Sequence, residues 1–161
     1  MIYVSAATET DMQRILDIEQ DSISPPWPHG ALLSEIYCED SFFAVARRVA
    51  SMRGASSAHD ILGFVILRRA ADEGELFQIA VDKTARRRGI ADMLMGAALE
   101  YVSGCGLTSV YLELRASNEA AACLYEKHGF VRLRSRKNYY TDPAEDALVM
   151  VRYCIAAKSV V

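Results

Sequence analysis

The sequence predicts a mixed α/β fold in which helices cover a central, mostly antiparallel sheet. Apolar runs that alternate like β-strands take turns with segments whose apolar residues recur every three or four positions, as in amphipathic helices. Their order is strand, two helices, three strands, helix, strand, helix and two strands, which favours a sheet of about seven strands flanked by about four helices. A chain of 161 residues can bury one good core, so we expect a single domain over residues 1–161.

The first half of the chain is expected to contain three strands and two helices. A strand over 2–6 precedes a helix that Thr8 or Thr10 caps. Proline cannot continue a helix, so the segment Ser24-Pro25-Pro26-Trp27-Pro28 ends this one. The rest of this half is a second helix over 31–37 and strands over 41–49 and 61–69, joined by a polar hairpin loop over 50–60.

The second half continues the same interleaving. A turn over 71–74 leads into a strand over 75–81, and a helix begins around Arg88 and ends at Gly104 and Gly106. The apolar stripe of this helix is Ile90, Met93, Leu94, Ala97, Ala98 and Tyr101. The remaining elements are a strand over 107–115, a helix over 118–128 closed by Gly129, and strands over 130–140 and 147–154 separated by the turn 141–143.

Charge and cysteine usage exclude several classes of protein. A net charge of −3 argues against a direct nucleic-acid partner, and the local basic run Arg132, Arg134, Arg136 and Lys137 is interpreted as a solvated strand face, with partner binding as the alternative. The cysteines, Cys38, Cys105, Cys123 and Cys154, form no C-x-x-C pair, so neither a disulfide framework nor a metal site is expected. Each is expected to be a small buried residue in a reducing compartment.

No signal peptide and no apolar run of membrane-spanning length is visible, so we expect a cytoplasmic protein without a membrane partner, as a monomer or weak oligomer.

The segment Arg86-Arg87-Arg88-Gly89-Ile90-Ala91 predicts a phosphate site, because it lies between an apolar strand and the start of an amphipathic helix. The first N–H groups of a helix have no partner within the helix and lie at the positive end of its dipole, where a pyrophosphate binds well. Gly89 permits a tight turn, Ala91 keeps the approach open, and three arginines add charged donors. The alternative is a basic loop that caps a helix and contacts only water.

Longer segments resemble a known family. The turn Arg86-x-x-Gly89-x-Ala91, the segment Leu112-Glu113-Leu114-Arg115-Ala116-Ser117-Asn118 and the segment Leu124-Tyr125-Glu126-Lys127-His128-Gly129-Phe130 are similar to those of the GNAT acetyltransferases. The Glu-x-Arg-Ala-Ser-Asn segment, followed by Asn138-Tyr139-Tyr140, resembles in particular the RimI type, the ribosomal-protein-alanine N-acetyltransferases. The resemblance covers about 76–150 and is loose before that.

The resemblance implies the GNAT fold, with acetyl-CoA in a cleft where the fourth and fifth strands separate. The cofactor-binding residues it implies are the backbone of Ile79, Ala80 and Val81 for the pantetheine arm and acetyl group, Arg86, Arg87, Arg88, Gly89, Ile90, Ala91 and Asp92 for the pyrophosphate, and Asn118. On sequence alone, Asn118 is also an ordinary N-cap. Arg86 and Ala91 replace the glutamine and glycine that are frequent in the family.

The resemblance further implies two catalytic residues. Glu113 would be the general base, through a water, and it lies on the strand face opposite Val110, Leu112 and Leu114. Tyr125 would be the general acid that protonates the departing thiolate. Without the resemblance, Glu113 reads as a solvated glutamate and Tyr125 as an amphipathic core tyrosine.

The acceptor is expected to be a protein N-terminus, because the family's cleft accepts a chain end. Candidates to line its site are Trp27, Tyr139 and Tyr140, although Trp27 also reads as a core anchor. Glu35, Glu39 or Asp146 would pair with a basic second residue of the substrate.

The expected function is direct transfer of acetyl from acetyl-CoA to the N-terminal amine, alanine above all, of a small-subunit ribosomal protein. The alternatives are a GNAT enzyme that acetylates a lysine side chain, a polyamine or another small amine, and an acetyl-CoA-binding regulatory or scaffold module. The presence of both Glu113 and Tyr125 argues against a purely binding role.

Overall fold

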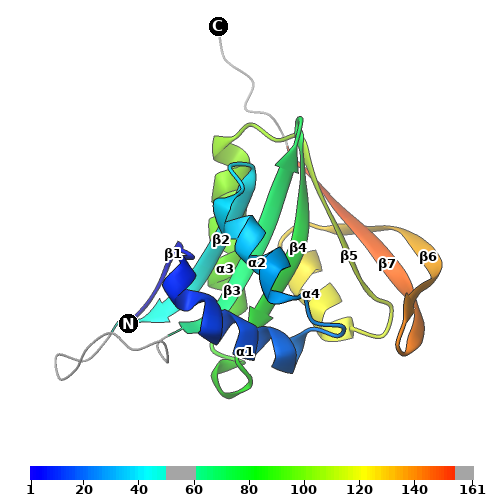
Figure 1. Cartoon of the computed structure of the whole chain (residues 1–161). Helices are drawn as coiled ribbons and strands as arrows, with labels where there is room; N and C mark the ends of the chain where they lie inside the picture. The colour runs from blue at the N-terminus through cyan, green and yellow to red at the C-terminus, as the bar shows by residue number, and fades with distance from the viewer. Residues whose placement is uncertain (50–60, 155–161) are drawn as a thin grey trace, which may run out of the picture.

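A seven-stranded sheet forms the centre of the computed structural model, which describes residues 1–49 and 61–154 (Figure 1). Only β4 and β5 are parallel, and every other neighbouring pair is antiparallel. In sheet order the strands are β1 (Ile2–Ala6), β2 (Ser41–Arg48), β3 (Ile61–Ala70), β4 (Glu73–Val81), β5 (Ser109–Arg115), β7 (Ala144–Tyr153) and β6 (Val131–Thr141). The predicted mixed, mostly antiparallel sheet is confirmed.

Helices cover both faces of the sheet. In Figure 1, α1 (Met12–Ser22) and α2 (His29–Tyr37) lie in front of the strands, and α3 (Ile90–Gly104) and α4 (Glu119–Lys127) lie behind them. Short 3-10 turns, η1 (Glu9–Asp11) and η3 (Lys83–Ala85), precede α1 and α3. Two apolar clusters follow from this arrangement, one between the sheet and α1–α2 and a larger one between the sheet and α3–α4. Each fully buried Leu or Ile in them contributes about 1.5–3 kcal/mol.

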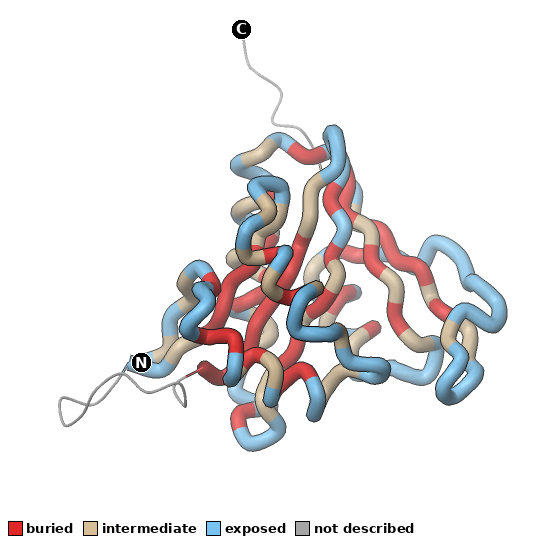
Figure 2. Tube along the Cα trace, in the orientation of Figure 1, coloured by how far each residue is buried: buried red, intermediate tan, exposed pale blue. Residues whose placement is uncertain are grey.

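Burial is concentrated on the central strands and falls off toward β6, one of the two edge strands (Figure 2). Every residue of β6 except Tyr140 is exposed, so the basic run over 132–137 lies on a solvated strand, as predicted. The structure adds that Arg136 in this run bonds to Glu113 of β5.

Most predicted elements have the correct type, with boundaries within a few residues. The hairpin before β4 was predicted too long, because Glu73 already pairs with Ala70 and the turn is only Ala71 and Asp72. The predicted stripe of α3 was wrong at Met93, which is exposed, since the buried positions are Ile90, Leu94, Met95, Ala98 and Val102. The loop predicted over 50–60 lies outside the described residues.

The cysteines were expected to be buried, and this was wrong. All four are free thiols, but Cys123 is exposed and the other three are only half-buried. In the part of the chain that is described, no helix is long and apolar enough to cross a membrane, and no group of three or more His, Cys, Asp or Glu could hold a metal ion.

The parallel pairing of β4 with β5 is short. It runs from Glu73–Ser109 to Leu76–Leu112 and stops there, although both strands continue. At that point β4 contains a β-bulge, since Ile66 of β3 faces Gln78, Leu67 faces Leu76, and Phe77 has no partner. We call the separation of the two strands beyond Leu76 and Leu112 the β4–β5 split.

The backbone on the β3 side of the split is closely packed, which predicts the effect of Gly63→Ala. A Cβ on Gly63 would lie 2.6 Å from the carbonyl oxygen of Ala80, so β3 and β4 would have to move apart. We expect a loss of about 1–3 kcal/mol in the free energy of unfolding. Chemical denaturation measures this loss directly.

Gly96→Ala, in the interior of α3, is the matched control. No atom lies within 4 Å of its added Cβ, so the variant should gain about 0.5–1 kcal/mol from helix propensity. Equal stability of the two variants would contradict the close β3–β4 approach.

Candidate active site

A groove of about 320 Å³ lies on the α1–α2 face of the sheet, beside the β4–β5 split. Its walls include Glu75 and Phe77 of β4, Tyr111 and Glu113 of β5, and Arg68 of β3. Strand alternation explains the set on β5: Val110, Leu112 and Leu114 point into the core under α3 and α4, so Tyr111 and Glu113 point the other way. The groove combines these charged and polar side chains with apolar ones such as Phe77, and it is open to solvent.

Glu113 is the carboxylate of this groove nearest the split. It accepts a hydrogen bond from the Arg136 guanidinium, and its side chain keeps 24% of its surface exposed, so water can reach it. Burial, and to a smaller extent the nearby Glu113 carboxylate, raise the pKa of Glu75, which lines the same groove. Glu113 therefore lies in a polar cleft and is not a freely solvated strand residue.

Tyr139 and Tyr140 lie beside Glu113 because β6 is irregular there. Arg136 faces Ala147 and Tyr140 faces Glu145, so three residues of β6 lie opposite Asp146 alone. Asn138 adopts a positive φ of 52°, and its N–H donates to the Asp146 carboxylate over 2.8 Å. A hydrogen bond to Glu113 is the main reason that the pKa of Tyr139 is raised. Asp146 thus shapes this bulge, which differs from the predicted contact with a substrate.

Tyr125 of α4 lies on the other face of the sheet, within the cluster under α3 and α4. It is 8% exposed, and its ring packs 5.8 Å from that of Phe130. Burial, and to a smaller extent Tyr140, raise the pKa of Tyr125, while burial and then Glu113 raise that of Tyr140. Tyr140 is therefore within electrostatic range of both Tyr125 and Glu113.

The start of α3 has the features predicted for a phosphate cradle, defined here as residues 86–92. The first helical hydrogen bond runs from the Met93 N–H to the Gly89 carbonyl over 3.1 Å, which leaves the N–H groups of Ile90, Ala91 and Asp92 without an acceptor in the helix. Gly89 has a φ of 76°, and no atom lies within 4 Å of where its Cβ would be. The side chains of Arg87 and Arg88 are exposed beside these groups.

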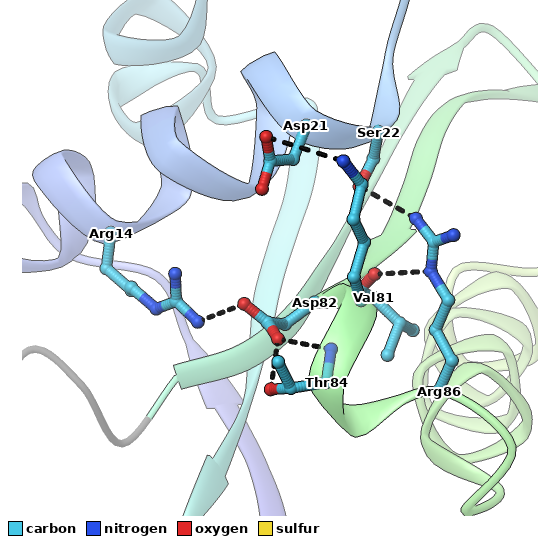
Figure 3. A network of polar contacts seen from close by, with 8 residues as sticks. Arg14, Asp21, Ser22, Val81, Asp82, Thr84 and Arg86 are labelled. Atoms are coloured by element: carbon cyan, nitrogen blue, oxygen red, sulfur yellow. Dashed lines mark hydrogen bonds and ion pairs between the residues drawn. The ribbon is translucent and has the colours of Figure 1, made fainter.

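Polar contacts connect the cradle to α1 (Figure 3). Asp82 accepts from the N–H of Thr84 over 2.8 Å and is bonded to Arg14, and the Thr84 hydroxyl and then Arg14 lower the pKa of Asp82 to about 2. Arg86 donates to the carbonyl of Val81 over 3.1 Å and to the hydroxyl of Ser22 over 3.3 Å. In this structure the Arg86 side chain therefore stabilises the turn, while Arg87 and Arg88 extend into solvent.

Two other predicted cofactor residues have structural partners of their own. The Asp92 carboxylate contacts Lys127 over 2.8 Å and His128 over 2.9 Å, which joins the start of α3 to the end of α4 and lowers the pKa of Asp92. Asn118 accepts from the Ala121 N–H over 3.2 Å, so its N-cap role is confirmed. Its contact with a cofactor stays a prediction.

The backbone of Ile79, Ala80 and Val81 pairs with β3 on one side only, since the β5 ladder has already ended at Leu76. This segment begins at the split and leads along β4 toward the cradle at the start of α3. An open strand edge followed by unpaired N–H groups matches an extended ligand with a pyrophosphate at one end. These residues therefore fit acetyl-CoA.

The residues predicted to line the acceptor site lie in different surroundings, and some of them do not face the groove. Trp27 packs behind the groove, with its ring 5.5 Å from that of Phe77. Glu35 is buried and bonded to Arg68, so it has no free carboxylate for a substrate, whereas Glu39 is exposed at the far end of α2. Neither Trp27 nor the two tyrosines is among the described residues that line the groove itself.

Arg115 is a site residue that sequence reasoning missed. Its guanidinium donates to the carbonyls of Pro143 (3.0 Å) and Ser24 (3.3 Å) and lies 4.3 Å from the centre of the Tyr140 ring. It therefore joins the β6–β7 turn to the loop after α1. The sequence did contain a signal for Arg115. It lies two residues after Glu113, and alternation places both side chains on one face of the strand.

An open strand edge with a phosphate cradle on one face and a carboxylate groove on the other is the arrangement of an acyl-CoA-dependent transferase. The sequence profile of the Acetyltransferase (GNAT) family matches residues 12–130. The chain belongs to this family and is an acetyl-CoA-dependent N-acetyltransferase.

Relatives and solved structures agree with this assignment. The [ribosomal protein bS18]-alanine N-acetyltransferase of Haemophilus influenzae is 32% identical over 156 residues, covering 95% of this chain and 99% of that protein. The enzyme of the same name from Escherichia coli K12 is 33% identical, covering 91% and 94%. The crystal structure of the E. coli ribosomal-protein-S18-alanine N-acetyltransferase has a TM-score of 0.84 at 30% identity and covers 100% of this chain and 99% of its own. Ard1 from Thermoplasma volcanium has a TM-score of 0.83 at 26% identity, covering 96% and 98%.

The cradle geometry predicts that Gly89→Ala weakens acetyl-CoA binding. A Cβ there must adopt a positive φ and narrows the approach to the unpaired N–H groups. We expect the Kd for acetyl-CoA, measured by calorimetry, to rise about tenfold or more, equivalent to ~1.4 kcal/mol.

Gly106→Ala is the matched control at the opposite end of α3. Its φ is 66° and its Cβ would also meet no atom within 4 Å, so both variants should lose a similar ~1–2 kcal/mol of stability. If both changed acetyl-CoA binding alike, the effect of Gly89 would be one of stability and the cradle assignment would fail.

Proposed function

We propose that this enzyme acetylates the N-terminal amine, alanine above all, of a small-subunit ribosomal protein. The observation that carries the proposal is the position of Glu113, in a solvent-open groove at the point where β4 and β5 separate. An acceptor amine in the groove would meet the acetyl group in the split, and the two ligands would approach from opposite faces of the sheet. The names of the Haemophilus and E. coli relatives support the choice of acceptor.

In the proposed reaction Glu113 removes a proton from the amine, through a bridging water. An α-amine has a pKa near ~8, so at neutral pH it must lose a proton before it attacks, and a carboxylate with access to water suffices as the base. Arg136, which bonds to Glu113, and Tyr139, which lies beside it, restrict the orientation of its carboxylate. They act as positioning groups for the base.

Tyr125 supplies a proton to the departing thiolate. Burial raises its pKa, so the phenol holds its proton at neutral pH until a thiolate forms beside it. The amine attacks the thioester directly, so no covalent enzyme intermediate and no cysteine is required.

Peptide acetylation tests the proposed acceptor. We expect consumption of acetyl-CoA with a short peptide that begins Ala-Arg, and none with the same peptide carrying a blocked N-terminus and a free lysine. The blocked peptide offers no α-amine, and at neutral pH a far larger fraction of α-amines than of lysine side chains is deprotonated. Turnover restricted to the lysine would move the enzyme to the side-chain class. Silence with both peptides, despite acetyl-CoA binding, would indicate another amine or a binding role.

The proposed roles of Glu113 and Tyr125 predict a shared signature in their variants. Glu113→Gln and Tyr125→Phe should each lower kcat about 10²-fold or more, with little change in the Kd for acetyl-CoA, since general acid and base catalysis acts on the transition state.

Cys123→Ser is the control for these two variants. This exposed thiol lies on α4 two residues from Tyr125, and direct transfer requires no thiol, so the variant should keep most of its activity. Loss of turnover in Cys123→Ser with intact acetyl-CoA binding would contradict direct transfer.

A further inference from the structure

Glu19 of α1 is a buried acid that the proposed mechanism does not use. It is 0% exposed, between α1 and β4. One carboxyl oxygen, Oε1, accepts two hydrogen bonds, from the Trp27 backbone N–H over 2.7 Å and from the Gln78 side-chain Nε2 over 3.0 Å. The other oxygen, Oε2, has no partner among the described residues, and neither has Oε1 of Gln78, which is 6% exposed.

These two unpartnered atoms belong to one pair of side chains, and together they suggest a proton between them. A carboxylic acid and a primary amide form a cyclic pair with two hydrogen bonds, N–H to carbonyl and O–H to carbonyl. The N–H bond is present, and an O–H on Oε2 would satisfy both remaining oxygens at once. Two unsatisfied buried acceptors would each cost about 1–3 kcal/mol.

The electrostatic surroundings agree with a neutral acid. Burial raises the pKa of Glu19, and the bonds from Trp27 and Gln78 oppose the rise without cancelling it. Neither partner is charged, and no charged side chain among the described residues contributes to the shift.

The pair connects the loop after α1 to the wall of the groove. The Trp27 ring packs on Phe77, the bulged residue of β4 that lines the groove. The Arg68 guanidinium also lies 5.4 Å from the centre of the Phe77 ring and is bonded to the buried Glu35. Glu19 thereby determines where Trp27, and through it Phe77, can lie.

We propose that Glu19 is a positioning residue for the acceptor site, acting as a neutral acid that pairs with Gln78 and binds the Trp27 backbone. Its effect on activity rests on the proposed function, because Phe77 borders the groove assigned to the acceptor. Its effect on Trp27 does not depend on any substrate. Trp27 is the single tryptophan of the chain, so tryptophan fluorescence reports on this contact alone.

The test compares Glu19→Gln with Glu19→Met. Gln keeps the Oε1 acceptor and can donate from Nε2 to Gln78, so the emission maximum, the acrylamide quenching and the peptide KM should stay close to wild type. Met has a similar length and neither bonding group. It should shift the emission to the red and raise the peptide KM about tenfold, with the Kd for acetyl-CoA changed less than about twofold.

The pH dependence of the free energy of unfolding, compared between wild type and Glu19→Gln, tests the proposal even if Glu19→Met does not fold. An acid whose pKa is raised by folding stabilises the protein fully below its unfolded pKa, near 4.5, and loses that contribution as the pH rises toward its folded pKa. Gln does not titrate. Glu19→Gln should therefore gain stability relative to wild type as the pH rises above about 4.5.

Three results would overturn the proposal: a red-shifted, destabilised Glu19→Gln, an unchanged Trp27 signal in Glu19→Met, or equal changes in peptide KM and acetyl-CoA affinity. If the wild-type enzyme did not acetylate the alanine peptide, the proposed function would fail, while fluorescence and stability would still decide the role of Glu19.

Discussion

The architecture depends on the point at which the parallel pairing of β4 with β5 stops, well before either strand ends. Four residue pairs join these strands, and after Leu76 and Leu112 each continues with one edge unpaired. A break in the middle of a sheet leaves backbone N–H and carbonyl groups without partners, which is costly unless something replaces the missing strand. The bulge at Phe77 lies at this same position, and a bulge bends and twists the strand that carries it, so β4 turns away from β5 where the ladder ends.

Contacts on the neighbouring elements hold this unpaired strand edge in place. On the β3 side, Gly63 permits an approach so close that a methyl group would meet a backbone carbonyl. At the carboxyl end of β4, Arg14 and Asp82 attach the turn to α1, and Asp92 attaches α3 to α4. The strand edge is thus rigid although it is unpaired. A rigid edge binds an extended ligand with little loss of conformational entropy.

Local patterns predicted most elements, their order and the glycine turn that opens α3, because alternation, helical periodicity and the Arg-Arg-Gly turn are properties of short segments. The irregular features were not predictable in this way. The Phe77 bulge, the β6 bulge at Asn138 and the pairing of Arg136 with Glu113 depend on strand register, which a single strand does not encode. Met93 shows the same limit. Apolar residues flank the stripe of α3 on both sides, Met93 on one and Met95 on the other, so the sequence does not determine which of them faces the sheet. Packing against the sheet decides this, and it buries Met95.

The bulge also explains how the same strand serves two different surfaces. Leu76 and Ile79 pack toward α3 and α4, but the extra residue lets Phe77 and Gln78 both face α1 and α2. Backbone groups dominate the side proposed for acetyl-CoA, and side chains dominate the groove. Backbone geometry changes little with substitution, whereas the groove changes with each side chain that lines it. The fold can therefore keep one acetyl donor while its acceptor changes, and Phe77 is the position at which the two surfaces are joined.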